Sequence, residues 1–147
     1  MSPNLQAFLD MIAVSEGTAG RGDNGYNVIV GGSLFEGYDD HPRKLVWIRA
    51  GLASTAAGRY QLLKRYYDAY KKQLDLPNFS PLSQDLIAIQ QIRERGALQD
   101  IEKGYISVAI DKVKNIWASL PGAGYGQHEN KLDKLITAYK DAGGTVA

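Results

Sequence analysis

The sequence contains no cysteine and only two histidines in 147 residues. The absence of cysteine excludes disulfides, thiolate metal sites and a cysteine nucleophile. His41 and His128 lie far apart and neither has a histidine four residues away, so the sequence predicts no metal site. An excess of one charge is also lacking, because 17 Lys and Arg stand against 16 Asp and Glu. The net charge of +1 gives no strong field for a polyanion, which disfavours nucleic acid as the main partner.

Long apolar runs are missing as well. None approaches the ~20 residues that a transmembrane helix needs, so membrane insertion is not expected. Residues 1–15 have no basic start and carry Asp10 inside the apolar pattern, unlike a secretory signal peptide. With 44% apolar and 22% charged residues, we expect one folded domain over residues 1–147.

Glycine, by contrast, is abundant early in the chain, where nine of the sixteen glycines fall between residues 17 and 58. The turn signal Asp23-Asn24-Gly25 precedes an alternation of Tyr26, Val28 and Val30, which predicts a β-hairpin. Leu45–Ile48 is a second candidate for extended structure because it is rich in β-branched and aromatic residues. We therefore expect a small β-lobe over residues 17–58, inserted after the first helix.

The rest of the chain has apolar residues at helical spacing. A first helix begins at Ser2 as N-cap and Pro3 as first residue. Ser80 and Pro81 give the same start signal for a later helix. Further helices are predicted near residues 60–74, 98–101, 106–120 and 132–139, and we expect the helix over 106–120 to be the central, most buried one. The fold class is therefore α+β and mostly helical.

Glu16 occupies an unusual place at the end of the first predicted helix. At ~100° per residue it falls on the apolar face, four residues after Ile12 and seven after Leu9. Gly17 follows, so the carboxyl also lies at the helix C-terminus, where the dipole disfavours negative charge. Burial and dipole both penalise the ionised form, so we expect a raised pKa, as a general acid requires. The alternative is that the side chain leaves this face and meets water or an arginine.

Two further segments combine small residues with polar and aromatic ones. Ser54–Gln61 offers the close backbone approach, aromatic face and amide that suit a sugar. In the alternative interpretation Thr55 is an N-cap, Arg59 is solvated and Tyr60 belongs to the core. Tyr125, in the glycine loop of residues 121–127, is either a binding platform or a core residue that folds back.

Five fragments follow one another in the order Ser15–Thr18, Gly25–Gly32, His41–Arg43, Gly58–Leu62 and Asn115–Gly122. In this order and spacing they closely resemble the bacteriophage lambda lysozyme (endolysin) family, over nearly the whole chain. The resemblance implies a lysozyme-like α+β fold with a small β-hairpin lobe flanking an active-site cleft, and no cofactor.

The resemblance also implies a substrate and a mechanism. Members of the family cleave bacterial peptidoglycan between N-acetylmuramic acid and N-acetylglucosamine as lytic transglycosylases. Their catalytic glutamate falls on Glu16, which protonates the glycosidic oxygen and then takes a proton from the muramoyl C6 hydroxyl to give a 1,6-anhydro product. The family's cleft-lining positions, implied to bind substrate, fall on Tyr26, Asn27, Ser54, Arg59, Tyr60, Gln61, Tyr125 and Gln127.

Two alternatives stay open. A hydrolytic lysozyme would use water and a second carboxylate, for which Asp23, Asp39 and Asp40 are candidates with surface roles as the other interpretation. A non-catalytic peptidoglycan-binding module would keep the cleft without the reaction. For the enzyme we expect a monomer that accumulates in the host bacterial cytoplasm, and the resemblance implies release to the periplasmic peptidoglycan by a separate holin, causing host cell lysis.

Overall fold

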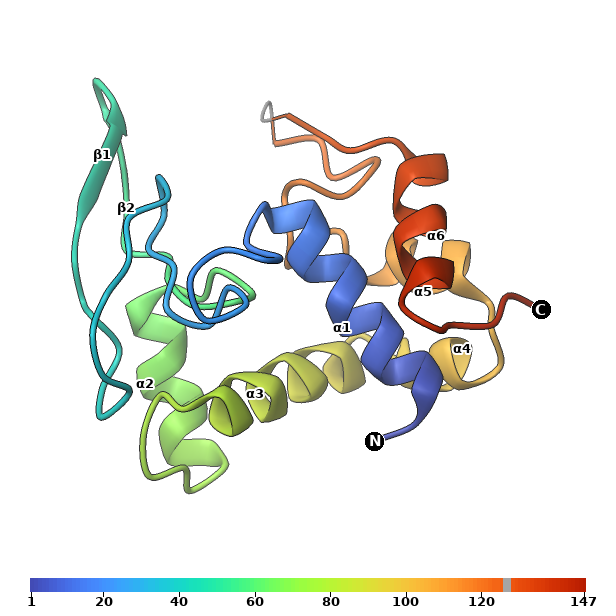
Figure 1. Ribbon diagram of the computed structural model, residues 1–147, viewed down its shortest axis with the longest axis horizontal. Coiled ribbons are helices and arrows are strands. Elements are labelled where there is room, and N and C mark those ends of the chain that lie inside the picture. Colours follow the sequence, from blue (N-terminus) through green and yellow to red (C-terminus); the bar gives the residue numbers. More distant parts are fainter. Residues whose placement is uncertain (126–127) are drawn as a thin grey trace. The chain divides into compact units, whose positions relative to one another are not determined.

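The structure is a computed structural model that describes residues 1–125 and 128–147. Helices dominate these residues, with one two-stranded antiparallel sheet (Figure 1). In chain order the elements are α1 (Pro3–Glu16), β1 (Val46–Arg49), β2 (Leu52–Ser54), α2 (Lys64–Gln73), α3 (Pro81–Glu94), α4 (Leu98–Glu102), α5 (Ile106–Val113) and α6 (Leu132–Asp141).

The chain divides into two compact units. The first consists of Met1–Gly17 and Ala88–Ala147, and contains α1, α4, α5 and α6. The second is Thr18–Ile87, which contains β1, β2 and α2. Helix α3 starts in the second unit and ends in the first. The β-lobe expected over residues 17–58 falls almost wholly within the second unit, which also includes α2.

Helix α1 begins and ends as its sequence predicts. The Ser2 hydroxyl accepts a hydrogen bond from the Leu5 N–H at 3.1 Å, and Pro3 is the first helical residue. Gly17 ends the helix with φ of 77°, a left-handed conformation that favours glycine. Helix α1 packs against α4 and α6. Its buried residues lie on most of its circumference: Leu5, Ala7, Phe8, Leu9, Met11, Ile12, Ala13 and Ser15.

The prediction of a long central helix over residues 106–120 is wrong in two respects. Helix α5 ends at Val113, and α1 has more buried positions than α5. Residues 114–122 form successive turns, including hydrogen bonds from Ile116 N–H to Val113 O and from Leu120 N–H to Trp117 O. Trp117 and Leu120 are nevertheless buried. Their apolar spacing therefore reflects burial of a turn segment rather than a continuing helix.

The β-hairpin lies later than the turn signal predicted. Strands β1 and β2 pair in the register Val46 to Ser54 and Trp47 to Ala53, with an irregularity before Arg49. Residues 26–34 form only isolated bridges, such as Val28 with Leu34. Gly25, Gly31 and Gly32 have positive φ values, which bend the chain too often for a continuous ladder. The expected extended segment at Leu45–Ile48 is confirmed as the first strand of the hairpin.

The second unit has its own small core of Ala57, Leu62, Tyr67, Phe79 and Ile87. His41 is buried against the rings of Tyr67 and Phe79, and its Nε2 lies 2.8 Å from the Leu62 carbonyl oxygen. Its other nitrogen accepts from the Arg43 N–H. His41 is therefore a core histidine with both ring nitrogens hydrogen-bonded.

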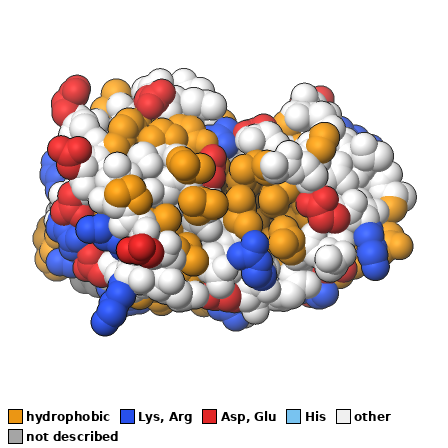
Figure 2. Space-filling model, turned by 90° about the horizontal axis from the view of Figure 1, so that it is seen from below, with side chains coloured by type: hydrophobic (Ala, Val, Ile, Leu, Met, Phe, Trp, Pro, Cys, Tyr) orange, Lys and Arg blue, Asp and Glu red, His pale blue; other side chains and the backbone are white. Residues whose placement is uncertain are grey.

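On the face that Figure 2 shows, Lys and Arg side chains lie next to Asp and Glu side chains, with apolar patches between them, so neither sign of charge dominates there. This mixture agrees with the net charge of +1. None of the helices in the described part of the chain combines the length and the hydropathy that crossing a membrane requires.

Candidate active site

Glu16 is the last residue of α1 in the first unit, and the residue as a whole is half-buried. Helical phase brings it to the apolar side, and the Gly17 cap turns the chain away immediately afterwards. The Ser119 hydroxyl donates a 2.5 Å hydrogen bond to Glu16 Oε2. Among the described residues, the side chain thus meets a hydroxyl from a distant turn rather than an arginine.

The environment of Glu16 changes its acidity. Burial raises the pKa of this carboxyl from its ordinary value of 4.5 to about 7, and the hydrogen bond from Ser119 opposes the rise. The rise predicted from the sequence is confirmed, with burial as its main cause. At neutral pH such a group exists in comparable amounts as acid and base, so it can give a proton and later accept one.

In the second unit, Asp85 gathers two tyrosines. Its Oδ1 accepts hydrogen bonds from Tyr26 OH at 2.9 Å and from Tyr60 OH at 2.6 Å. The two rings meet edge to face, with centroids 6.4 Å apart. The guanidinium of Arg59 lies over both rings, 5.4 Å from the Tyr26 centroid and 5.7 Å from the Tyr60 centroid. The structure therefore brings three of the sequence-predicted binding residues into one cluster.

Burial changes what two of these residues can do. Arg59 is 3% exposed and Tyr60 is 5% exposed. The Arg59 side chain donates to the Asn24 carbonyl oxygen at 3.0 Å, and its backbone N–H donates to Gln84 Oε1 at 2.9 Å. Direct contact with a bound glycan fits these side chains poorly. They hold Tyr26, which is only half-buried and keeps part of its surface accessible.

Asn27 and Gln61 are also engaged in local structure. Asn27 Oδ1 accepts from the Asp23 N–H at 2.8 Å. Gln61 Nε2 donates to the carbonyl oxygens of Val28 and Gly58, at 3.2 and 2.9 Å. Both side chains are half-buried. They shape the loops near Tyr26 with one end and leave the remaining amide atoms for other partners.

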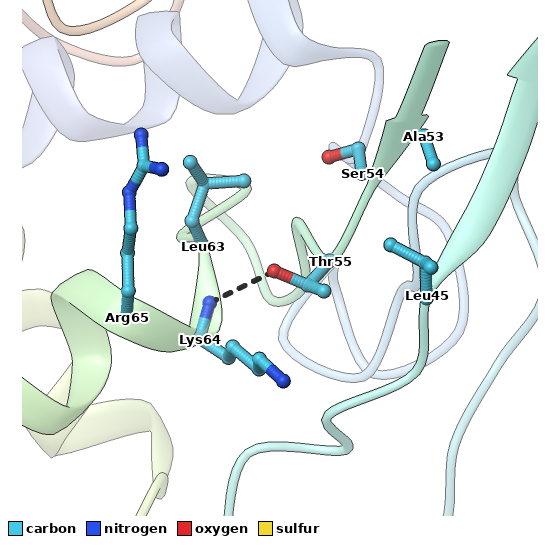
Figure 3. A pocket seen from close by; sticks show the side chains of 7 residues that line it. All are labelled: Leu45, Ala53, Ser54, Thr55, Leu63, Lys64 and Arg65. Atoms are coloured by element: carbon cyan, nitrogen blue, oxygen red, sulfur yellow. Dashed lines mark hydrogen bonds between the residues drawn. The ribbon is translucent and has the colours of Figure 1, made fainter. Parts of the chain in front are cut away.

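Ser54 lies elsewhere in the second unit, on the wall of a pocket of about 240 Å³. The lining is partly apolar and partly polar, and consists of Leu45, Ala53, Ser54, Thr55, Leu63, Lys64 and Arg65. Figure 3 shows these side chains around the pocket and the hydrogen bond from the Lys64 backbone N–H to the Thr55 hydroxyl, which is 3.1 Å long. The N-cap of α2 is Leu63, so the interpretation of Thr55 as an N-cap residue is wrong, although its hydroxyl accepts from the first N–H of that helix.

Tyr125 is exposed, at 56% of its surface, and its OH lies 3.4 Å from the Asn115 carbonyl oxygen. The segment that carries it is held by Glu129, whose two carboxylate oxygens accept from the N–H groups of Gly124 and Gly122 at 3.0 and 2.9 Å. These N–H groups lower the pKa of Glu129. Tyr125 thus does not fold back into the core, whereas Gln127, the other site residue predicted here, lies outside the described residues.

The candidates for a second catalytic carboxylate have other partners. Asp40 pairs with Arg43 at 2.7 Å, and this guanidinium lowers the pKa of the Asp40 carboxyl. Asp23 accepts a 2.5 Å hydrogen bond from Tyr38 OH. Asp39 is exposed. These geometries agree with the surface and turn roles that were the other interpretation.

Sequence reasoning missed Asp85, Gln84, Ser119 and Asn130. Gln84 is buried on α3, three and four residues before the buried Ile87 and Ala88, so its helical phase could have revealed it. Asn130 is buried, and its side-chain amide donates to the Ser15 carbonyl oxygen at 3.0 Å. No local pattern marks Asn130 or Ser119, because their partners lie far away in the sequence.

Known proteins similar to this chain point in one direction. The family model described as Endolysin matches residues 6–146. The chain is 63% identical over 145 residues to the endolysin of Escherichia phage lambda, a match that covers 96% of this chain and 92% of the relative. It is 55% identical over 157 residues to the endolysin of Escherichia phage P2, covering 98% and 95%.

Solved structures agree. A structure described as bacteriophage lambda lysozyme complexed with a chitohexasaccharide matches with a TM-score of 0.98 and 60% identity, covering 100% of this chain and 98% of that one. A second structure of the lysozyme from bacteriophage lambda matches with a TM-score of 0.93 and 59% identity over the same shares of the two chains. The expected lysozyme-like fold is confirmed by these matches.

Proposed function

The chain belongs to the endolysin family and is a lysozyme-type enzyme of peptidoglycan degradation and host cell lysis, and from this premise we propose that it is a lytic transglycosylase with Glu16 as its single catalytic carboxyl. The bond cleaved is the β-1,4 bond between N-acetylmuramic acid and N-acetylglucosamine. The observation that carries the proposal is the half-buried Glu16, with its pKa near neutrality.

The reaction needs one group that acts twice. Glu16 first donates its proton to the glycosidic oxygen, so that the bond from this oxygen to the muramoyl C1 breaks and the N-acetylglucosamine hydroxyl leaves. The ionised Glu16 then takes the proton of the muramoyl C6 hydroxyl, whose oxygen bonds to C1. The product is a 1,6-anhydro sugar, Glu16 has regained its proton, and water is not consumed.

The acidity of Glu16 suits both steps. A carboxyl with a pKa of about 7 keeps its proton often enough to act as the acid at neutral pH, and its conjugate base is stronger than that of an ordinary carboxyl. Asp23 and Asp40, each with a partner of its own, favour chemistry without a second carboxylate.

Several of the predicted site residues are proposed to contact the glycan. Tyr26 offers an accessible ring face, and Asn27 and Gln61 offer the amide atoms that the local structure does not use. Ser54 lines the mixed pocket, Tyr125 is an exposed aromatic platform, and Gln127 is kept from the sequence. Arg59 and Tyr60 are assigned the indirect role of holding Tyr26.

Digestion of purified sacculi tests the mechanism. The wild type should release muropeptides with 1,6-anhydro ends, and digestion in H₂¹⁸O should leave these ends unlabelled. Labelled reducing ends would instead establish hydrolysis and overturn the transglycosylase assignment.

The role of Glu16 is tested in the same assay with Glu16→Gln, which removes the transferable proton but keeps the shape. We expect activity to fall by about 10²–10⁴-fold with folding retained. The matched control is Glu36→Gln, which alters an exposed glutamate and should leave activity unchanged. If Glu16→Gln keeps full turnover, Glu16 is not the acid. If the wild type itself binds sacculi but does not cleave them, the protein is a binding module.

The proposal extends to the cell. The enzyme is made in the host bacterial cytoplasm and reaches the periplasmic peptidoglycan when a separate holin opens the inner membrane. It acts as a monomer. Expression in a host without a holin should leave the cells intact until the inner membrane is permeabilised.

A further inference from the structure

A series of hydrogen bonds connects helix α6 with Glu16 through side chains of the first unit. Lys134 Nζ donates to Asn130 Oδ1 at 3.1 Å, and Asn130 Nδ2 donates to Ser15 Oγ at 3.1 Å. Ser15 Oγ lies 2.7 Å from Ser119 Oγ, and Ser119 Oγ donates to Glu16 Oε2 at 2.5 Å. The residues come from the end of α1, from the turn segment after α5, from the loop before α6 (Asn130) and from α6 itself (Lys134).

The chemistry of the groups gives this series one direction. An ammonium group can only donate, so the atom of Asn130 that faces Lys134 must be the amide oxygen. The amide nitrogen can only donate, so Ser15 Oγ accepts from it and has its own proton left for Ser119. Ser119 in turn directs its proton to Glu16. The donor between the two serines, which the distance alone leaves open, is therefore Ser15.

Burial protects the middle of the series. Asn130 and Ser15 are each 7% exposed, so water competes little for their hydrogen bonds. Asn130 is also fixed by its backbone, whose N–H donates to the Ser119 carbonyl oxygen at 2.7 Å, and by its amide, which donates to the Ser15 carbonyl oxygen at 3.0 Å. The side chain therefore joins the end of α1 to the turn that carries Ser119.

We propose that Asn130, Ser15 and Ser119 are positioning residues that fix Glu16 Oε2 as a permanent hydrogen-bond acceptor and so leave Oε1 to carry the transferable proton. Protonation of Oε2 would place two hydrogens between Ser119 Oγ and Oε2, so the proton of the acid form resides on Oε1. Within the described residues, Oε1 has no hydrogen-bond partner. The inference rests on the proposed role of Glu16.

The series also balances the acidity of Glu16. Two effects set the pKa of Glu16: burial raises it, and the Ser119 hydrogen bond lowers it by stabilising the carboxylate. Charged neighbours are not among the causes. The charged group that the series brings in is Lys134, which stands exposed on α6 at the far end. Without the final donor, burial would act unopposed and the base form needed in the second step would become scarce at neutral pH.

The experiment is a ¹³C NMR titration of the Glu16 side-chain carboxyl in the intact protein, with the signal assigned by its loss in Glu16→Gln. Ser119→Ala should raise the pKa of Glu16 by about one unit or more, because a hydrogen bond to a charged group is lost. Ser15→Ala removes a single buried hydroxyl that is separated from Glu16 by two hydrogen bonds of the series. This variant should raise the pKa of Glu16 by about half a unit. Ser107→Ala on α5 is the matched control, because Ser107 is exposed and outside the series.

Kinetics on sacculi supply a second readout. Ser15→Ala and Ser119→Ala should lower kcat several-fold and leave KM nearly unchanged, because neither hydroxyl is placed against the glycan, and Ser119→Thr, which restores a hydroxyl, should recover most of the kcat. If the pKa of Glu16 is the same in Ser15→Ala as in Ser107→Ala, the positioning role is wrong, even if Glu16→Gln is inactive. If Glu16→Gln remains active while the pKa shifts occur, the proposed catalytic role fails and the hydrogen-bond series stands.

Discussion

At the scale of single residues, Glu16 shows how the placement of a side chain changes its acidity. Helical phase and the Gly17 cap decide where the carboxyl points, and burial then raises its pKa to about 7. The same burial has a thermodynamic cost. Above neutral pH the folded protein must hold a carboxylate where a neutral acid is favoured.

That cost predicts how stability depends on pH. Below pH 4.5 the carboxyl is protonated in both the folded and the unfolded chain, so it has no effect on the free energy of unfolding. Between pH 4.5 and about 7 the unfolded chain has lost a proton that the folded chain keeps, so stability falls as pH rises, and it levels off above. Glu16→Gln lacks this titration and should gain up to about 3 kcal/mol relative to the wild type by pH 8.

Urea denaturation of both proteins at several pH values measures the difference. Glu36→Gln is again the control, because it makes the same chemical change at an exposed side chain. A constant difference between the wild type and Glu16→Gln from pH 4 to pH 8 would show that the carboxyl is not shifted.

At the scale of elements, the sequence is most informative where the structure depends on neighbouring residues. Ser2 with Pro3 and Ser80 with Pro81 start α1 and α3 as predicted, and the Ser80 hydroxyl accepts from the Ser83 N–H at 3.3 Å. Glu16 was found in the same way, because its position follows from the period of one helix.

The errors arose where distant contacts decide. Trp117 and Leu120 kept a helical spacing in a segment of turns because other elements bury them, and the Tyr26–Val30 segment lost its expected ladder to glycine bends. Ser119 and Asn130 could not be predicted as partners of Ser15, because 104 and 115 positions separate them from it. The position of Glu16 at the end of α1 could therefore be predicted from neighbouring residues, whereas its polar partners depend on tertiary contacts.

Two glycines of the second unit have a positive φ but differ in the space around them. Gly58 has φ of +85°, and a Cβ there would lie 2.8 Å from Phe79 Cζ and 2.9 Å from Gln84 Cδ, both buried. Gly51 has a similar φ of +77° but no atom within 4 Å of such a Cβ. Gly58→Ala should cost about 2–4 kcal/mol from backbone strain and overpacking, whereas Gly51→Ala should cost about 1 kcal/mol from strain alone. Equal urea midpoints for the two variants would contradict this account.

At the scale of the whole molecule, helix α3 belongs to both compact units. Its residues up to Ile87 pack in the second unit, and those from Ala88 onward in the first. If one unit unfolded alone, α3 would have to break near the boundary between Ile87 and Ala88. We therefore expect the two units to unfold together, in a single cooperative transition.

Core substitutions in each unit provide the test. Ile110→Ala in the first unit and Phe79→Leu in the second both affect fully packed side chains and should lower Tm, by about 5–15 °C for Ile110→Ala. In calorimetry each variant should keep a single transition that moves as a whole. Two transitions, of which only one moves, would show that the units unfold separately.

The hydrogen bonds of Glu129 shift its pKa in the opposite direction to that of Glu16, so the turn near Tyr125 responds to a lower range of pH. Its carboxylate acts as a staple across Gly122 and Gly124, and the lowered pKa means that this staple is in place at every pH above the ordinary range of a glutamate. As pH falls through that lowered pKa, protonation removes the ionic acceptor and the staple opens. Mild acid would therefore keep Glu16 protonated and so remove the base that the proposed mechanism needs, whereas only stronger acid would release the turn next to Tyr125, so the two changes should occur at separate points of one pH titration.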